Sequence, residues 1–241
     1  MNFTKQLFKR ISNSLGFEIH RFNSAASSLG LFMAALKTFE IDMILDVGAN
    51  QGQYAQQLRI GGFTGDIISF EPLSDAYAVL DKKSKNDKKW TAFPRCAIGD
   101  SEDAITINIS QNSVSSSVLP MLTSHLAAAP MSAYIGNEIV DVHKLDTLWP
   151  TLKPRGKSRL LKIDTQGFEW QVLDGAKEML KDMSGVQIEL SLLPLYKDQH
   201  LWRDCIDRLE AEGFTLWSLQ SAFTDHGSGR TMQWDGLFFR Q

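Results

Sequence analysis

Three acidic residues in the second half of the chain stand where side chains can do chemistry. Asp164 ends a short apolar run, Glu169 follows at the start of a predicted helix, and Glu189 lies near the end of the next apolar run. Acids gathered at neighbouring strand ends are costly unless they are paired or functional. A carboxylate within about 3 Å of a hydroxyl group can take its proton, and three carboxylates can also hold Mg²⁺. The residues leave both roles open, and Glu169 has the further role of stabilising the start of its helix.

A glycine-rich turn, Asp-Val-Gly-Ala-Asn-Gln-Gly over 46–52, follows an apolar run in the first half of the chain. Gly48 and Gly52 let the backbone approach a ligand closely. Their spacing is not the GxGxxG of a dinucleotide site, which argues against an NAD-dependent oxidoreductase, and the Gly-Lys-Ser/Thr of a P-loop is absent. Glu71, at the end of the next apolar run, is placed to accept both hydroxyls of a ribose. Together these features predict a ligand that carries adenosine without a diphosphate.

These residues need a sheet to bring them together. Short apolar runs are typical of buried parallel strands, and they predict strands at 43–47, 66–70, 91–98, 159–164, 186–190, 214–219 and 236–240. Helical patterns alternate with them at 25–39, 54–59, 74–83, 168–180 and 196–212. This alternation predicts an α/β protein with a doubly wound sheet. Ligands bind such sheets at the carboxyl ends of the strands.

Residues 101–150 break this rhythm. Ile105, Ile107 and Ile109 alternate with polar residues, residues 139–145 do so more loosely, and a serine-rich stretch over 113–130 lies between them. This pattern predicts an insertion made of a strand pair and a long loop, and long loops inside a compact domain are often functional. The expected organisation is a pair of N-terminal helices in 1–40 and one domain over 41–241, with the insertion at about 101–150.

The composition limits the class of protein. The chain has 241 residues, of which 43% are hydrophobic and 22% charged, and this suits one α/β domain with a sizeable core. The formal net charge is −3. Residues 1–22 hold a basic excess, so the body of the chain is acidic and lacks the broad positive field of a nucleic-acid-binding domain. The two cysteines, Cys96 and Cys205, form no CxxC pair, so a zinc site is not expected.

Residues 1–22 predict a short basic amphipathic helix. Apolar residues recur there at helical spacing beside basic ones, namely Phe3, Leu7, Phe8, Ile11 and Leu15 beside Lys5, Lys9 and Arg10. The helix either caps the domain core or makes a weak peripheral contact with an anionic membrane. Because the sequence shows neither a run of 18 apolar residues nor a secretory signal, we expect a cytoplasmic protein, with a position at the inner face of the membrane as the alternative.

At the residues that can do chemistry, the sequence resembles the FkbM-type methyltransferases, from about residue 41 to the end of the chain. The matching segments are 46–52, Phe-Glu-Pro at 70–72, Ala-Ile-Gly-Asp at 97–100, Leu-Asp at 145–146, Leu-Lys-Ile-Asp-Thr-Gln-Gly-Phe-Glu at 161–169, Val-Leu-Asp-Gly-Ala at 172–176, Ile-Glu at 188–189 and Pro-Leu-Tyr at 194–196. The block over 161–169 is the most specific of them. The resemblance implies a class I methyltransferase (Rossmann-like) fold, a doubly wound seven-stranded sheet whose last strand is antiparallel.

The resemblance also implies S-adenosylmethionine as the methyl donor and assigns residues to it. The residues expected beside its methionine part are Asp46, Gly48, Ala49, Asn50 and Gly52. Its ribose is expected at Glu71, and its adenine beside Ala97, Ile98 and Asp100. Asp164 is expected beside both the sulfonium and the acceptor.

The expected reaction is methyl transfer to the oxygen of a hydroxyl group, most simply on a sugar or glycan. We rank the candidate bases as Asp164, then Glu189, with Glu169 as a further catalytic candidate and His143, His125 and His200 as weaker ones. If Mg²⁺ takes part, its expected ligands are Asp164, Glu169 and Glu189. The alternatives are a polyketide or other small-molecule hydroxyl as acceptor, and a non-catalytic, membrane-associated binding module that uses the basic helix.

Overall fold

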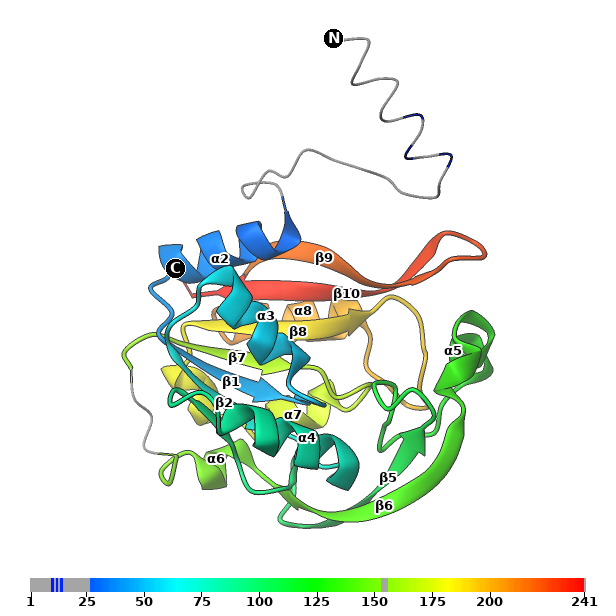
Figure 1. Cartoon of the computed structure of the whole chain (residues 1–241), viewed down its shortest axis with the longest axis horizontal. Coiled ribbons are helices and arrows are strands. Elements are labelled where there is room, and N and C mark those ends of the chain that lie inside the picture. The colour runs from blue at the N-terminus through cyan, green and yellow to red at the C-terminus, as the bar shows by residue number, and fades with distance from the viewer. Residues whose placement is uncertain (1–9, 11, 13, 15–26, 153–155, 241) are drawn as a thin grey trace.

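The centre of the protein is a seven-stranded sheet, seen in a computed structural model that describes residues 10, 12, 14, 27–152 and 156–240 (Figure 1). Its strands are β1 (Met43–Val47), β2 (Asp66–Phe70), β3 (Trp90–Ala92), β7 (Arg159–Ile163), β8 (Gly185–Ser191), β9 (Thr215–Asp225) and β10 (Arg230–Phe239). They lie in the order β3-β2-β1-β7-β8-β10-β9. Neighbours from β3 to β8 pair in parallel, whereas β10 is antiparallel to both β8 and β9. The predicted seven-stranded sheet with an antiparallel last strand is confirmed.

Helices cover both faces of this sheet. On one face, α2 (Ser28–Thr38) and α3 (Gln53–Gly61) bury Leu36 and Leu58 against Ile44 of β1. The other face is covered by α6 (Leu145–Leu148), α7 (Glu169–Asp174), the 3₁₀ turn η2 (Met179–Asp182) and α8 (Trp202–Ala211). Successive strand residues point to opposite faces, so Asp46 points to the same face as Ile44, beneath α3. This alternation puts a polar side chain inside a fully buried strand.

A second sheet of three strands carries the insertion. It consists of β4 (Ala97–Ile98), β5 (Asp103–Ser110) and β6 (Tyr134–His143), in the order β4-β6-β5. Ile107 of β5 packs with Val140 of β6 and with Ala76 of α4 (Ser74–Ser84). Between β5 and β6 lie α5 (Thr123–Ala128) and the 3₁₀ turn η1 (Pro130–Ser132). In Figure 1 the arrows of β1, β7 and β8 point toward the side on which β5, β6 and α5 lie, so the insertion reaches the carboxyl ends of the central strands.

Several predicted elements differ from the observed ones. The strands predicted at 214–219 and 236–240 are longer, since β9 runs to Asp225 and β10 begins at Arg230. The strand predicted at 91–98 is two strands, because β3 ends at Ala92 in the main sheet and β4 begins at Ala97 in the second. The helix predicted at 168–180 is interrupted after α7, and η2 follows it. The helix predicted at 196–212 begins only at Trp202. Its first residues belong to a loop that buries Leu195 and Tyr196, whose N–H groups both donate to the side chain of Gln199.

The N-terminal part of the chain is described only in places. The predicted basic helix over 1–22 lies outside the described residues, apart from Arg10, Ser12 and Ser14, which are helical. The helix predicted at 25–39 is α2, and Ser27 caps it by accepting a hydrogen bond from the N–H of Gly30 at 3.0 Å. Within the part of the chain that the structure describes, no helix is long and apolar enough to cross a membrane.

Gly175, directly after α7, joins the main sheet to the insertion, and its substitution tests this contact. A Cβ added there would lie 1.9 Å from the carbonyl oxygen of Gly99. We expect Gly175→Ala to lower the free energy of unfolding by about 2 kcal/mol or more, because the backbone of Gly99 has to move. Gly136→Ala is the matched control, since a Cβ at Gly136 meets nothing within 4 Å. Urea unfolding of both variants measures this difference, and equal free energies of unfolding would contradict the contact between Gly175 and Gly99.

Candidate active site

A cavity of about 300 Å³ opens at the carboxyl ends of the central strands. Many of the residues predicted from the sequence line it, namely Gly48, Ala49, Asn50, Glu71, Ala97, Ile98 and Asp164. The remaining predicted residues are not among the described residues that line it, namely Asp46, Gly52, Asp100, Glu169 and Glu189. The sequence therefore located the cavity, while several of its candidates lie behind or beside it.

Glu71 is held rigidly at the edge of the cavity. It is buried, and its two carboxylate oxygens accept hydrogen bonds from the N–H groups of Asn50 (2.7 Å) and Leu73 (2.9 Å). Burial raises the pKa of Glu71 to about 7, against the lowering effect of these two bonds and of Lys162. Each oxygen keeps a further acceptor position for a ligand hydroxyl.

The two glycines of the turn are required by their protein neighbours. Gly48 has φ +79°, and a Cβ there would lie 1.8 Å from the carbonyl oxygen of Asp164. Gly52 has φ +82°, and a Cβ there would lie 2.6 Å from the ring of Trp90. Both positions are left-handed, which favours glycine. The turn thus brings the ends of β1 and β7 together and seats the start of α3 on Trp90.

A buried ion pair lies directly below the turn. Lys162 of β7 and Asp46 of β1 are cross-strand neighbours, and the Lys162 ammonium is 3.1 Å from Asp46 Oδ1. It also donates to the carbonyl oxygen of Gly48 at 3.1 Å, while the hydroxyl of Ser69 donates to Asp46 Oδ2 at 3.0 Å. Burial lowers the pKa of Lys162, but the carboxylates of Asp46 and Asp164 outweigh it and raise that pKa above its ordinary value. Lys162 therefore carries its charge inside the protein.

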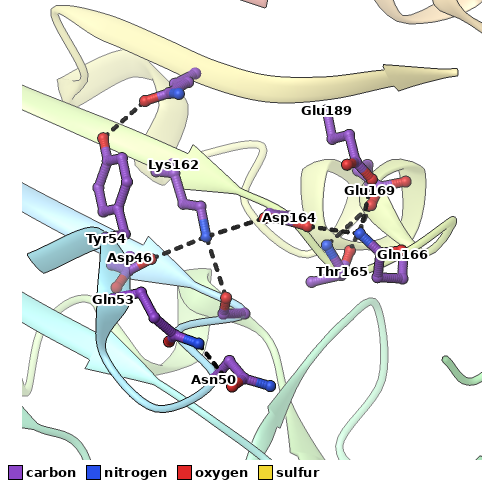
Figure 2. Close-up of polar contacts among 12 residues, drawn as sticks. Asp46, Asn50, Gln53, Tyr54, Lys162, Asp164, Thr165, Gln166, Glu169 and Glu189 are labelled. Carbon is purple, nitrogen blue, oxygen red and sulfur yellow. Dashed lines mark hydrogen bonds and ion pairs between the residues drawn. The ribbon is translucent and has the colours of Figure 1, made fainter. Parts of the chain in front are cut away.

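Asp164 is the carboxylate among the three ranked acids that faces the cavity. Its side chain is 37% exposed, and the Lys162 ammonium lies 3.5 Å from its Oδ2. Its Oδ1 accepts a hydrogen bond of 2.9 Å from the side-chain amide of Gln166. Figure 2 shows Lys162 between Asp46 and Asp164, and Gln166 on the far side of Asp164. Each oxygen of Asp164 is thus oriented by a different side chain.

Glu189 lies behind Gln166. The amide nitrogens of Gln166 (2.9 Å) and Gln233 (2.6 Å) both donate to its Oε2. Burial, followed by the charges of Asp164 and Glu169, raises the pKa of Glu189 well above its ordinary value. Because Glu189 lies behind Gln166 and does not appear among the described residues that line the cavity, it is less well placed than Asp164 to act as a general base.

Glu169 organises the loop that carries Asp164. Its Oε1 accepts hydrogen bonds from the N–H and hydroxyl of Thr165 and from the N–H of Gly167, and its Oε2 accepts a second bond from Gly167. Burial raises the pKa of Glu169 to about 7. This geometry fits the structural role that the sequence left open for Glu169 at the start of its helix.

The predicted magnesium alternative finds no support in this arrangement. Among the described residues no group of three His, Cys, Asp or Glu side chains is placed to hold a metal ion. Between Asp164 and Glu189 lies the amide of Gln166, which donates to both carboxyl groups. An amide N–H cannot be a metal ligand, so these two acids are bridged by hydrogen bonds instead.

The three histidine candidates are not among the described residues that line the cavity. His143 pairs with Glu102 through Nδ1 at 2.7 Å. His125 is buried, and burial lowers its pKa to about 4. His200 stacks on Trp170, with ring centroids 3.9 Å apart. Each histidine therefore has a structural contact away from Asp164.

Sequence reasoning missed several residues of the cavity. Lys162 belongs to the matching block over 161–169 but has no predicted role, although a lysine inside the apolar run 159–163 is a usable signal. Tyr54 of α3 donates to Gln187 of β8 at 2.7 Å, and its ring lies 5.2 Å from the Lys162 ammonium. Burial, followed by the charge of Asp164, raises the pKa of Asp235 of β10 to about 6. These residues carry no local motif: the sheet register brings Gln187 and Asp235 to the site, and the packing of α3 brings Tyr54 there.

The insertion supplies part of the cavity wall. Ser113, Val114 and residues 116–118 line the cavity, and the side-chain amide of Asn50 donates to Ser113 Oγ at 3.3 Å. Ile107 of β5 lines the same cavity, together with Phe168, Ala97 and Ile98. The cavity lining thus combines apolar side chains, such as Ile98 and Phe168, with polar residues, such as Asn50 beside Glu71 and Ser113 beside Asn50.

The sequence of this chain matches a known family. A family model described as "Methyltransferase FkbM domain" matches residues 46–216, so the chain belongs to the FkbM methyltransferase family. This is a family of S-adenosylmethionine-dependent methyltransferases. No curated protein sequence matches the chain.

Some solved structures are similar to this chain. A crystal structure of a methyltransferase FkbM from Methylobacillus flagellatus KT has a TM-score of 0.50 at 11% identity, and the match covers 99% of this chain and 71% of that one. The magnesium protoporphyrin IX methyltransferase of Synechocystis PCC 6803, solved with bound SAM, has a TM-score of 0.46 at 10% identity and covers 100% of this chain and 99% of that one. The first likeness shows the fold, a class I methyltransferase fold.

The raised pKa of Glu71 makes the stability of the ligand-free protein depend on pH. Its pKa is about 7 in the folded protein against an ordinary value of 4.5. Between these values the unfolded chain has lost a proton that the folded protein keeps, so this group destabilises the fold increasingly as pH rises from about 4.5 to 7. The full difference is about 3 kcal/mol. We expect Glu71→Gln to reduce the drop in the free energy of unfolding between pH 5 and pH 8 by about this amount.

Urea unfolding at a series of pH values measures this drop. The comparison uses the change between pH 5 and pH 8, because the amide introduced by Glu71→Gln gives up a backbone hydrogen bond at every pH. Glu210→Gln, at an exposed position of α8, is the matched control and should leave the drop unchanged. An identical drop in wild type and Glu71→Gln would contradict the buried environment of Glu71.

Proposed function

We propose that this protein transfers a methyl group from S-adenosylmethionine to a hydroxyl oxygen of a neutral sugar or glycan, with Asp164 as the general base. The observation that carries the proposal is the orientation of Asp164, which faces the cavity while Lys162 and Gln166 hold its two oxygens. A base must lie within hydrogen-bond reach of the proton that it removes. Of the three ranked acids, Asp164 meets this requirement best.

The cavity fits the methyl donor in its charge and in the order in which its lining residues would meet the parts of the donor. Glu71, Asp164 and Asp235 face it with Lys162 as their basic neighbour, so acidic groups are in excess. S-adenosylmethionine carries two cationic groups and one carboxylate, which suits an acidic site. Glu71 would accept the ribose hydroxyls, the apolar wall near Ile98 would face the adenine, and the turn at 48–50 would hold the methionine part. A volume of about 300 Å³ is at the small end for ligand sites, so the acceptor would dock at the mouth.

When bound, the donor supplies an electrophilic methyl group and the protein mainly supplies orientation. Asp164 would take the proton of the acceptor hydroxyl as the hydroxyl oxygen attacks the methyl carbon, and the bond from that carbon to the donor sulfur would break, with S-adenosylhomocysteine as the leaving group. Lys162 and Gln166 keep the carboxylate aimed during this step. The raised pKa of Glu189 favours its uncharged form, which limits the negative charge beside Asp164.

The polar residues at the cavity favour an uncharged polyol as acceptor. Those not assigned to the donor or to the base include amides and hydroxyls, namely Gln53, Gln57, Ser113 and Ser116. Such groups both donate to and accept from sugar hydroxyls. Lys162 is the basic residue among the described lining residues, and it is already paired with Asp46 and Asp164. A phosphate or carboxylate on the acceptor would therefore lack a partner at the reacting end.

Asp164→Asn tests the base. We expect it to lower the methyl-transfer rate on the best acceptor by about 100-fold or more, because an amide cannot take the hydroxyl proton. The dissociation constant of this variant for S-adenosylhomocysteine, the demethylated donor, should change little. The assay measures transfer of labelled methyl to neutral oligosaccharides, nucleotide sugars and polyketide alcohols, with and without EDTA.

The matched control is Asp207→Asn, at an exposed position of α8, which should transfer at the wild-type rate. Full activity of Asp164→Asn would remove Asp164 as the base. A wild-type protein that binds the donor but methylates only an anionic or non-sugar acceptor would overturn the acceptor class. Loss of activity with EDTA would contradict a reaction in which the acids work without a metal.

Cofactor affinity should also depend on pH through Glu71. Its ionised carboxylate accepts ribose hydroxyls at both oxygens, and its pKa is about 7. Calorimetry with S-adenosylhomocysteine should therefore show affinity falling several-fold, and at most about tenfold per pH unit, as pH drops from 8 to 6. In Glu71→Gln the affinity should be weak and nearly constant over this range. A flat wild-type profile would argue against Glu71 as the ribose partner.

A further inference from the structure

Tyr196 belongs to the Pro-Leu-Tyr segment of the family resemblance, and the proposed function gives it no role. It lies in the loop between β8 and α8 and is fully buried. Its hydroxyl donates to Gln166 Oε1 at 2.9 Å and to the carbonyl oxygen of Ser115 at 3.2 Å. Burial raises the pKa of this phenol above its ordinary value, so the hydroxyl keeps its proton. One proton thus serves two acceptors that belong to different parts of the chain.

The ring of Tyr196 cannot move far. A Cβ on Gly167 would lie 3.0 Å from the ring, so the glycine allows close packing of the Asp164 loop on it. The ring of His125 from α5 packs edge-on at 5.2 Å between centroids. The packed ring therefore fixes the position of the hydroxyl. Because the hydroxyl cannot move to follow its two acceptors, its hydrogen bonds depend on where those acceptors lie.

The first of these bonds decides which way the amide of Gln166 faces. With Oε1 on the Tyr196 hydroxyl, Nε2 points to Asp164 Oδ1 and Glu189 Oε2, both at 2.9 Å. If the amide rotated by half a turn, its oxygen would face two carboxyl groups and the Asp164 contact would be lost. The Tyr196 hydroxyl, as the donor to Oε1, selects the productive orientation.

The second bond reaches the cavity wall made by residues 113–118, which we term the roof segment. Ser117 of this segment donates to the carbonyl oxygen of Gln166 at 2.6 Å, and Asn50 donates to Ser113. The roof segment therefore contacts the glycine turn at one end and the Asp164 loop at the other. Because the Tyr196 proton is shared, a roof segment that moves away from Tyr196 leaves that proton to Gln166 alone.

We infer that Tyr196 is a positioning residue that couples the roof segment to the orientation of Asp164. The inference rests on the proposed role of Asp164 as the base. Docking of the acceptor against the roof segment then changes the hydrogen bond that Tyr196 donates to Gln166. Through Gln166, this changes how tightly the Asp164 carboxylate is held in its orientation. Tyr196 touches neither the acceptor nor the donor in this scheme.

Tyr196→Phe keeps the ring and removes the hydroxyl. We expect the turnover number to fall by about tenfold, the scale of one lost hydrogen bond, while the dissociation constant for S-adenosylhomocysteine stays within about twofold. The acid limb of the pH profile of turnover should shift to higher pH, because Asp164 loses a fixed donor. A purely structural loss would lower the fraction of active protein and leave that profile in place.

Tyr134→Phe is the matched control. The Tyr134 hydroxyl also donates to a carbonyl of the insertion, that of Leu119 at 2.7 Å, and it contacts Ser117 of the roof segment, but its hydrogen bonds do not involve Gln166. We expect turnover and pH profile to stay at wild-type values in this variant. Equal losses in Tyr134→Phe and Tyr196→Phe would overturn the inference, since they would indicate general loosening of the insertion.

A double mutant and a spectroscopic measurement separate this inference from the proposed function. In a Gln166→Ala background, Tyr196→Phe should lower the turnover number by less than about threefold, because Gln166, which links Tyr196 to Asp164, is already missing. In ¹⁵N spectra of the full chain, the Gln166 side-chain amide, assigned by its absence in Gln166→Ala, should shift in Tyr196→Phe and not in Tyr134→Phe. This readout needs no acceptor, so it decides even if no hydroxyl substrate is methylated. An unshifted amide or an additive double mutant would overturn the coupling.

Discussion

Lys162 holds a positive charge in the interior, and the arrangement of the site follows from where that charge lies. Isolated buried charges are very costly, whereas a buried pair with good hydrogen bonds is tolerated. Asp46 pairs with the ammonium from one side and Asp164 from the other, while the carbonyl of Gly48 accepts a further bond. If Lys162 were neutral or absent, Asp46 would lie uncompensated in a fully buried strand, and the charges of Asp164 and Asp235 would repel each other without a neutralising neighbour. The glycine turn, the strand ends and the base thus depend on one ammonium.

Around this ammonium, carboxyl groups of the same chemistry take different roles because their surroundings differ. Glu71 and Glu169 accept backbone N–H bonds and are buried enough that the pKa of each rises to about 7. Burial, followed by the charges of Asp164 and Glu169, raises the pKa of Glu189 well above its ordinary value. Asp164 alone among the ranked acids combines exposure to the cavity with donors on both oxygens. Separation of acid–base roles by environment rather than by residue type is a general feature of enzyme sites.

The sequence predicted those parts of the structure that have a local signal. Apolar runs located β1, β2, β7 and β8, and the family motifs located the residues at their carboxyl ends, because strand ends and turns leave marks in short stretches of sequence. It could not predict that residues 91–98 divide between two sheets, since each half is equally apolar and the choice depends on β6, far along the chain. The sequence ranked Asp164 before Glu189, but it could not supply the physical difference between them, because this depends on Gln166 and on Gln233, which reach them through sheet register and loop geometry.

The position of β10 between β8 and β9 has a consequence for the order in which the molecule assembles. β9 and β10 form a hairpin of neighbouring segments, which can pair early, but only β10 pairs with the rest of the sheet. The hairpin must therefore dock as a unit, through contacts distant in sequence that are slow to form. Gln233 and Asp235 arrive with it. An intermediate in which β1, β2, β7 and β8 have paired would hold Glu189 without the amide of Gln233 and would expose the edge of β8, the kind of unpaired edge through which partly folded chains associate.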